Sequence, residues 1–184
     1  MTQYTNGQLY KTVVIDPPWP SKFIVLKRRP NQKEMPYKTM TIEEIKNFPI
    51  NDYADTDCNL FVWTTHSWLK DTFSIIEAWG FKYHCCITWD KTNGLSLFGF
   101  TRQTEFVIFA YRGKITVNQR GKFIPTQITE AQGKHSEKPQ IFYQILSRNT
   151  PEPRIDIFSR KKHFGFDSWG NQAENPTTLE AFTN

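Results

Sequence analysis

The sequence predicts an α/β fold in which a mostly parallel β-sheet is covered by helices on both faces. The main observation is that short apolar segments alternate along the chain with segments whose apolar residues recur at helical spacing. The chain has 184 residues, enough for one domain with a sizeable core, and 15% of them are aromatic, which suits such a core. We therefore expect a single domain over residues 1–184.

The first predicted elements each have a local signal. The run "TVVI", which ends directly before Asp16, predicts the first strand. Thr41 and Glu44 form the T-x-x-E pattern of a capping box, so a short helix is expected to begin there. The segment "CNLFVWTT" (58–65) predicts a second strand, and the residues that follow (67–80) have helical spacing and end in a glycine.

Three further strands are predicted in the second half of the chain, at "YHCCITW" (83–89), "EFVIFAY" (105–111) and "RIDIF" (154–158). Ligands of parallel α/β sheets bind at the carboxyl ends of the strands. Asp16 follows the first strand directly, so it is expected to lie at such a binding edge.

A third helix is predicted over 136–148. Ser136 is its expected cap, and Pro139 falls in its expected first turn, where a missing N–H is tolerated. Its apolar face is expected to contain Ile141, Phe142 and Ile145.

Two long segments, 17–38 and 112–135, do not fit the alternation of strands and helices. The first contains six basic residues and one acidic residue, and the second contains five basic residues and one acidic residue. The whole chain has a formal net charge of +5, so the excess positive charge is concentrated in these segments. Long irregular segments of compact domains are usually functional or disordered, and a basic excess is compatible with a polyanionic partner.

The cysteines and the hydropathy indicate the compartment. The three cysteines are odd in number, have no C-x-x-C spacing and include two adjacent residues, so neither a disulfide framework, a structural zinc ion nor another metal site is expected. No segment resembles a signal peptide, and no run approaches the roughly 18 apolar residues of a membrane span. The sequence therefore predicts a cytoplasmic protein with no membrane partner.

The segment "DPPW" after the first strand suggests a specific chemistry. An exocyclic amine of a nucleobase is a poor nucleophile, because its lone pair is delocalised into the ring. Asp16 could accept one N–H of such an amine, and the Pro17 carbonyl could accept the other. Pro18 restrains the backbone, and Trp19 could stack on the base. The alternative is a strand ended by prolines, with a tryptophan that returns to the core.

Six blocks in the same order resemble the MT-A class of amino-methyltransferases, the family of the catalytic subunit of the mRNA N6-adenosine methyltransferase, which has many bacterial and phage members. The blocks are "VVIDPPWP", "YKTMTIEEI", "LFVWTT", "ITWDKTNG", "HSEKPQIFYQIL" and "IDIFSRKKHFGFDSWGNQ". The resemblance covers about 10–172 and leaves a tail over 173–184. It implies a Rossmann-like sheet in permuted order, with the catalytic strand first and the cofactor strand late. It also implies a cytoplasmic protein of a bacterial cell or a phage-infected host.

The resemblance implies that the cofactor is S-adenosyl-L-methionine. Asp156 and Phe158 would lie near its adenosine, and Arg160 would reach its ribose or its carboxylate. Asn171 and Gln172 would bind the sugar. Asp16 would border the cofactor, Lys138 would contact its methionine end or the incoming nucleotide, and His163 would lie near the ribose. The alternatives are a plain strand at 154–158, a solvated loop at 171–172 and an ordinary surface histidine at 163.

The resemblance also suggests residues that bind the substrate. Tyr37 would close over the target base, although it could simply pack on the domain, and Trp89 could line the pocket or the core. Phosphate contacts are expected from Lys27, Arg28 and Arg29, and the alternative is a solvated charged loop.

The predicted function is transfer of a methyl group to the N6 amine of adenine in nucleic acid, with DNA preferred over RNA by family analogy. The alternatives are an RNA adenine methyltransferase, a DNA cytosine-N4 methyltransferase and a non-catalytic nucleic-acid-binding subunit of the same fold. The large extensions of the eukaryotic members are not found here, so any dimer is expected to be a homodimer.

Overall fold

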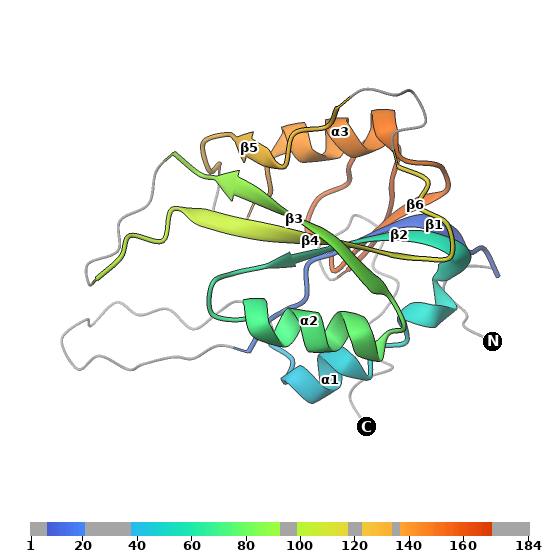
Figure 1. Cartoon of the computed structure of the whole chain (residues 1–184). Helices are drawn as coiled ribbons and strands as arrows, with labels where there is room; N and C mark the ends of the chain where they lie inside the picture. The colour runs from blue at the N-terminus through green and yellow to red at the C-terminus, as the bar shows by residue number, and fades with distance from the viewer. Residues whose placement is uncertain (1–6, 21–37, 93–98, 118–122, 134–136, 171–184) are drawn as a thin grey trace.

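The computed structural model describes residues 7–20, 38–92, 99–117, 123–133 and 137–170. Its elements, in chain order, are β1 (Tyr10–Ile15), α1 (Ile42–Lys46), the 3-10 helix η1 (Ile50–Asp52), β2 (Ala54–Thr64), α2 (Leu69–Ala78), β3 (Lys82–Asp90), β4 (Thr104–Arg112), β5 (Gln127–Thr129), α3 (Gln140–Asn149), β6 (Arg154–Ile157) and β7 (Asp167–Trp169). The strands form one seven-stranded sheet in the order β5-β3-β4-β2-β1-β6-β7. Helices α1 and α2 lie on one face of the sheet and α3 lies on the other (Figure 1).

The direction of β4 determines which residues meet at the binding edge. The pairs β1–β2, β1–β6, β6–β7 and β3–β5 are parallel, whereas β4 is antiparallel to both β2 and β3. Among the described strands β4 therefore runs against all the others. As a result, the first residues of β4 lie at the same edge as the carboxyl ends of its neighbours, and Glu105 is paired with Trp89 near the end of β3.

The two faces of the sheet have separate cores. On the face of α1 and α2, Ile45 and Ile76 pack with residues of the central strands such as Val13 and Leu60. On the face of α3, the buried side chains include Phe142, Tyr143 and Leu146 of the helix, together with Phe61 and Trp63 of β2. Burial of both sheet faces agrees with the fold class that the sequence predicts.

The expected strands and helices are all present, with different bounds. The capping box of α1 is confirmed, because the Thr41 side chain accepts from the Glu44 backbone and the Glu44 carboxylate accepts from the Thr41 backbone. Strands β5 and β7 were not predicted, because they have three residues each and no visible alternation of apolar and polar residues.

The prediction for the third helix was partly wrong. Helix α3 begins at Gln140, with Pro139 as its N-cap residue and no side-chain cap of its own, and Ser136 lies outside the described residues. Ile141 is 39% exposed and does not belong to the buried face, which is formed by Phe142, Tyr143 and Leu146. The helix is thus shorter and turned differently from the expected one.

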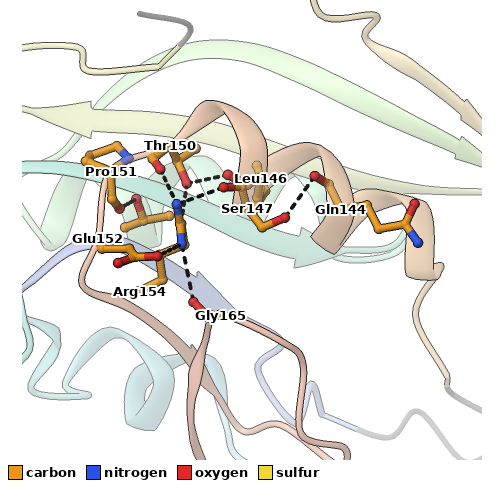
Figure 2. Close-up of polar contacts among 9 residues, drawn as sticks. Gln144, Leu146, Ser147, Thr150, Pro151, Glu152, Arg154 and Gly165 are labelled. Carbon is orange, nitrogen blue, oxygen red and sulfur yellow. Dashed lines mark hydrogen bonds and ion pairs between the residues drawn. The ribbon is translucent and has the colours of Figure 1, made fainter.

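Arg154 joins the end of α3 to the start of β6, as Figure 2 shows. Its buried guanidinium donates to the carbonyl oxygens of Ser147 (2.9 Å) and Thr150 (2.6 Å), which belong to the carboxyl end of the helix. It also donates to the Thr150 hydroxyl and the Glu152 carboxylate. These bonds satisfy helix carbonyls that have no partner within the helix.

Candidate active site

The catalytic candidate Asp16 lies at the carboxyl end of β1, between β2 and β6. Its backbone N–H donates to the Ile157 carbonyl at 3.2 Å, so the pairing of β1 with β6 continues up to this residue. The Asp16 side chain is 22% exposed at the edge of the sheet. This is the position at which parallel α/β sheets bind ligands.

The residues after Asp16 form a tight turn. The Trp19 N–H donates to the Pro17 carbonyl at 2.7 Å, a bond that spans two residues as in a γ-turn, and the Pro18 carbonyl accepts from Met40 at 2.8 Å. A carbonyl oxygen has two lone pairs, so Pro17 retains one further acceptor position.

The side chain of Trp19 is fixed against the sheet. Its indole Nε1–H donates to the Trp63 carbonyl at 3.1 Å. Its ring lies parallel to the ring of Trp68, with 6.2 Å between the centroids and 7° between the planes. Trp19 also packs against the core on the α1 and α2 face. It is therefore both a core residue and part of the wall beside Asp16.

Four charged side chains alternate in sign at this edge, and we name Asp16, Lys138, Glu105 and Lys91 the charged cluster. The Lys138 ammonium lies 3.3 Å from Asp16 Oδ2 and 3.0 Å from Glu105 Oε2. The other oxygen of Glu105 lies 3.1 Å from the Lys91 ammonium. The side chains of Lys138 and Glu105 are only 14% and 16% exposed, so the interactions are poorly screened by water.

The cluster changes the acidity of its members. Burial raises the pKa of Asp16, the Lys138 charge opposes this rise, and the Glu105 carboxylate adds to it. Burial also tends to raise the pKa of Glu105, but Lys138 and Lys91 outweigh it and the net direction is down. For Lys138, burial favours the neutral amine, yet the two carboxylates raise its pKa above the ordinary value. Glu105 and Lys138 are thus ionised at neutral pH.

Two buried tryptophan rings pack beside the charged cluster. The Lys138 ammonium lies 4.8 Å from the centroid of the buried Trp63 ring. Trp63 meets Trp89 edge to face, with 5.9 Å between the centroids. Trp89 is 1% exposed and belongs to the core of the α3 face, so the core alternative for this residue is the one observed.

On the β6 side, Asp156, Tyr143 and His163 form a buried polar group. The imidazole of His163 stacks on the Tyr143 ring at 3.4 Å, and its Nε2 lies 3.8 Å from Asp156 Oδ2. Burial raises the pKa of Asp156 to about 7, although hydrogen bonds with Tyr143 and Ser159 oppose the rise. Burial also lowers the pKa of His163 to about 4. His163 is 7% exposed, so the alternative of an ordinary surface histidine is wrong.

The backbone after β6 is unusual. Phe158 has a φ of 62°, a left-handed conformation that non-glycine residues rarely adopt. The Ser159 N–H donates to the Trp169 carbonyl at 3.1 Å, and a Cβ at Gly170 would lie 2.6 Å from the Ser159 carbonyl oxygen. Only glycine allows this close approach of two backbone segments. Such conformations cluster at functional sites.

The structure brings several of the predicted site residues together. Asp16 and Lys138 are in direct contact, and the charge of Arg160 is close enough to lower the pKa of Asp16, against the larger effect of burial. The side chain of Asp156 is buried below this edge. The predicted residues that lie outside the described part of the chain are Lys27, Arg28, Arg29, Tyr37, Asn171 and Gln172.

Four residues of the site were not predicted from the sequence: Glu105, Lys91, Trp63 and Tyr143. Glu105 had a signal, since it is an acidic residue that opens an otherwise apolar strand. In a parallel strand it would lie at the opposite edge. Only the antiparallel direction of β4, which the sequence analysis did not predict, brings it to the site.

The arrangement provides acceptors for a polar group that enters beside Asp16. A carboxylate and a backbone carbonyl follow one another at Asp16 and Pro17, and aromatic rings border them. Within the described residues, no group of three or more His, Cys, Asp or Glu side chains could hold a metal ion. Likewise, none of the described helices is long and apolar enough to cross a membrane.

Comparison with known proteins assigns the family. The model of the MT-A70 family matches residues 10–172, which include Asp16, the charged cluster and β6. The chain belongs to the MT-A70 family. The resemblance inferred from the six sequence blocks is thereby confirmed, and the mixed α/β sheet flanked by helices is consistent with a Rossmann-like methyltransferase fold.

Relatives of several kinds have similar sequences. The Type II methyltransferase M.MunI of Mycoplasma sp is 30% identical over 151 residues, which are 78% of this chain and 65% of the relative. An N(6)-adenosine-methyltransferase MT-A70-like protein of Arabidopsis thaliana is 29% identical over 89% of this chain and 24% of its own length. The human N(6)-adenosine-methyltransferase catalytic subunit METTL3 is 27% identical over 93% of this chain and 29% of its own length. This chain thus spans less than two thirds of the length of each of these relatives.

Proposed function

We propose that this protein transfers a methyl group from S-adenosyl-L-methionine to the N6 amine of adenine in nucleic acid, and that the nucleic acid is DNA. The observation that carries the proposal is the position of the Asp16 motif, at the carboxyl end of β1 and beside a charged cluster, in a chain that belongs to the MT-A70 family. Two of the relatives have names that specify an N(6)-adenosine methyltransferase.

Charges of both signs at this edge fit the cofactor. Lys138 and Arg160 both act electrostatically on Asp16, so cations and a carboxylate lie close together. A ligand that combines a carboxylate with a positively charged sulfur would find a partner for each group. When bound, S-adenosyl-L-methionine supplies a methyl group that a nucleophile can take directly. The described residues that we assign to its binding are Asp16, Lys138, Asp156, Phe158, Arg160 and His163.

The chain's own residues activate the amine. Lys138 contacts Oδ2 of Asp16, so Oδ1 is the oxygen that we assign to one N–H of the substrate amine. The remaining lone pair of Pro17 accepts the second N–H. These two bonds draw the nitrogen toward tetrahedral geometry and stabilise the positive charge that develops on it. Because burial raises the pKa of Asp16, this carboxylate is also suited to take the proton that the amine loses.

The preference for DNA is supported by similarity to one of these relatives. The relative with the highest identity of the three is a Type II methyltransferase, a class that acts on DNA, and 65% of its length is covered.

The test is a methylation assay with product identification. The purified protein is incubated with the cofactor and separate single-stranded DNA, double-stranded DNA and RNA, and the products are digested to nucleosides for mass spectrometry. We expect N6-methyldeoxyadenosine, and none with Asp16→Asn. N4-methyldeoxycytidine would overturn the choice of base, and N6-methyladenosine from RNA alone would overturn the choice of DNA.

A non-catalytic subunit of the same fold is distinguished by binding. Such a protein would bind an oligonucleotide, yet it would not be stabilised against heat by S-adenosylmethionine or S-adenosylhomocysteine. We expect a concentration-dependent rise in Tm with both cofactor forms. The intact Asp16 and Trp19 favour the enzyme.

A further inference from the structure

Lys138 lies just before a helix, α3, whose amino end is not capped by a side chain of its own N-cap residue. Helix α3 begins two residues after Lys138, and its N-cap residue is Pro139. The first backbone N–H groups of a helix have no partner within the helix and need acceptors from elsewhere. Unless those groups are satisfied, the start of α3, and with it Lys138, is poorly fixed.

Glu130 supplies the missing acceptors from another part of the chain. Its two carboxylate oxygens accept from the backbone of Gln140 at 2.8 Å and of Ile141 at 3.1 Å. A carboxylate also complements the positive end of the helix dipole. Both oxygens of one side chain are thus used to fix the first turn of α3.

Glu130 is itself firmly attached to the sheet. It follows β5 directly, its backbone N–H donates to the Asp90 carbonyl at 3.2 Å, and its own carbonyl accepts from Trp89 Nε1 at 2.8 Å. Trp89 in turn contacts the ring of Trp63, over which the Lys138 ammonium lies. The end of β3, the start of α3 and the lysine are therefore connected through Glu130 and two tryptophans.

We infer that Glu130 is a positioning residue, which caps α3 and thereby holds Lys138 between Asp16 and Glu105. The inference deepens the proposed function and rests on it. Within the described residues, Glu130 forms no hydrogen bond or ion pair with Asp16 or Lys138, so its effect on methyl transfer passes through the helix. Misplacement of a catalytic group by about 1 Å can cost up to about a hundredfold in rate, so a loosened Lys138 should be readily detected.

The kinetic test is a double-mutant cycle. Glu130→Ala should lower kcat/KM for methyl transfer about tenfold, since only part of the helix start is released. In the Lys138→Ala background the same substitution should change kcat/KM by less than about twofold. Glu130→Gln, which retains one acceptor oxygen, should give an intermediate value. Equal losses in both backgrounds would overturn the inference.

The matched control is Glu44, whose carboxylate caps α1 by accepting from the Thr41 backbone at 2.6 Å. Glu44→Ala likewise removes a carboxylate that caps a helix start, but from a helix that carries no site residue. It should lower Tm comparably and leave kcat/KM unchanged.

A second measurement does not depend on activity. A buried, ion-paired lysine ammonium exchanges slowly with water, so the Lys138 group should give a 1H–15N NMR signal, assigned by its loss in Lys138→Ala. Glu130→Ala should weaken this signal, and Glu44→Ala should leave it unchanged. An unaltered Lys138 signal in Glu130→Ala would refute the positioning role. A parent protein that methylates no nucleic acid would end the proposed function, and the spectra would still decide whether Glu130 holds Lys138.

Discussion

At the scale of single residues, the main feature is a lysine shared by two carboxylates. A lysine paired with Asp16 alone would compete with the substrate amine for the same carboxylate. Glu105 lies 3.0 Å from the Lys138 ammonium, closer than Asp16 at 3.3 Å, and so draws the cation away from Asp16. Burial has the largest effect on the pKa of Asp16 and raises it, and the Lys138 charge has the next largest effect and lowers it. The Glu105 carboxylate, by repulsion, raises the pKa further. Glu105 thus keeps Asp16 available as an acceptor and more basic.

The substitution Glu105→Gln tests this arrangement. With the repulsion removed, the pKa of Asp16 should fall, so the acid limb of the pH profile of kcat/KM should move to lower pH. At the optimum, kcat should fall by about tenfold or more, because Lys138 then turns to Asp16 as its remaining carboxylate. Measurement of methyl transfer across pH gives both quantities.

Glu43→Gln is the control, since it removes the same charge from an exposed position on α1. It should leave the profile unchanged. An acid limb of Glu105→Gln that stays in place, or moves to higher pH, would contradict the role that we give to Glu105.

The sequence could predict Asp16 and Lys138 but not their partner. Asp16 follows an apolar run and opens a distinctive tetrapeptide, so its position at a strand end can be read directly. Glu105 depends on the direction of its strand, and direction follows from long-range pairing rather than from local pattern. The contact between Tyr143 and His163 was equally hidden, because it depends on the packing of α3 against the turn after β6.

At the scale of elements, α3 is held at both ends by side chains from outside the helix. Glu130 caps its amino end and Arg154 binds the carbonyls at its carboxyl end. Neither contact can be read from the local sequence signals of helix ends. Those local signals place the cap of this helix at Ser136, whereas α3 begins at Gln140. The bounds of α1 were easier to predict, because Thr41 and Glu44 cap it from within.

Arg154→Lys should destabilise the protein by about 2–4 kcal/mol, since one ammonium cannot replace the guanidinium fork and buried carbonyls lose their donors. The measurement is urea denaturation of both proteins. Arg148→Lys is the control, because Arg148 is exposed on the same helix and its replacement should change the free energy of unfolding by less than about 0.5 kcal/mol. Equal stability of Arg154→Lys and the parent would show that the guanidinium fork is dispensable.

At the scale of the whole molecule, two buried groups tie stability to pH with opposite signs. The pKa of Asp156 is raised to about 7, so the folded protein keeps a proton that the unfolded chain loses near pH 4. Stability from this group is therefore lost as pH rises from about 4 to 7. The pKa of His163 is lowered from its ordinary value of 6.5 to about 4 in the folded protein. As pH falls from about 6.5 to 4, the imidazole therefore gains a proton only in the unfolded chain, which favours the unfolded state. The two effects partly offset one another in the parent.

Asp156→Asn isolates the first effect. The asparagine stays neutral, so the variant should gain stability relative to the parent as pH rises from about 4 to 7, by up to about 4 kcal/mol, and the difference should be constant above that range. Denaturant unfolding of both proteins at several pH values measures the difference. Asp71→Asn, which removes the same charge from a half-buried position on α2, is the matched control variant. A difference that stays flat or shrinks between pH 4 and 7 would mean that Asp156 is ionised in the folded protein throughout.

The alternation of charges in the cluster has a consequence for ionic strength. Lys91, Glu105, Lys138 and Asp16 sum to zero, and the pairs between them are largely shielded from the solvent. Dissolved ions therefore weaken the ion pairs of the cluster only slightly. In contrast, a polyanion that binds exposed basic side chains releases its counterions into the medium. Added salt should accordingly weaken the encounter with the polyanion far more than it slows the turnover of the complex once formed.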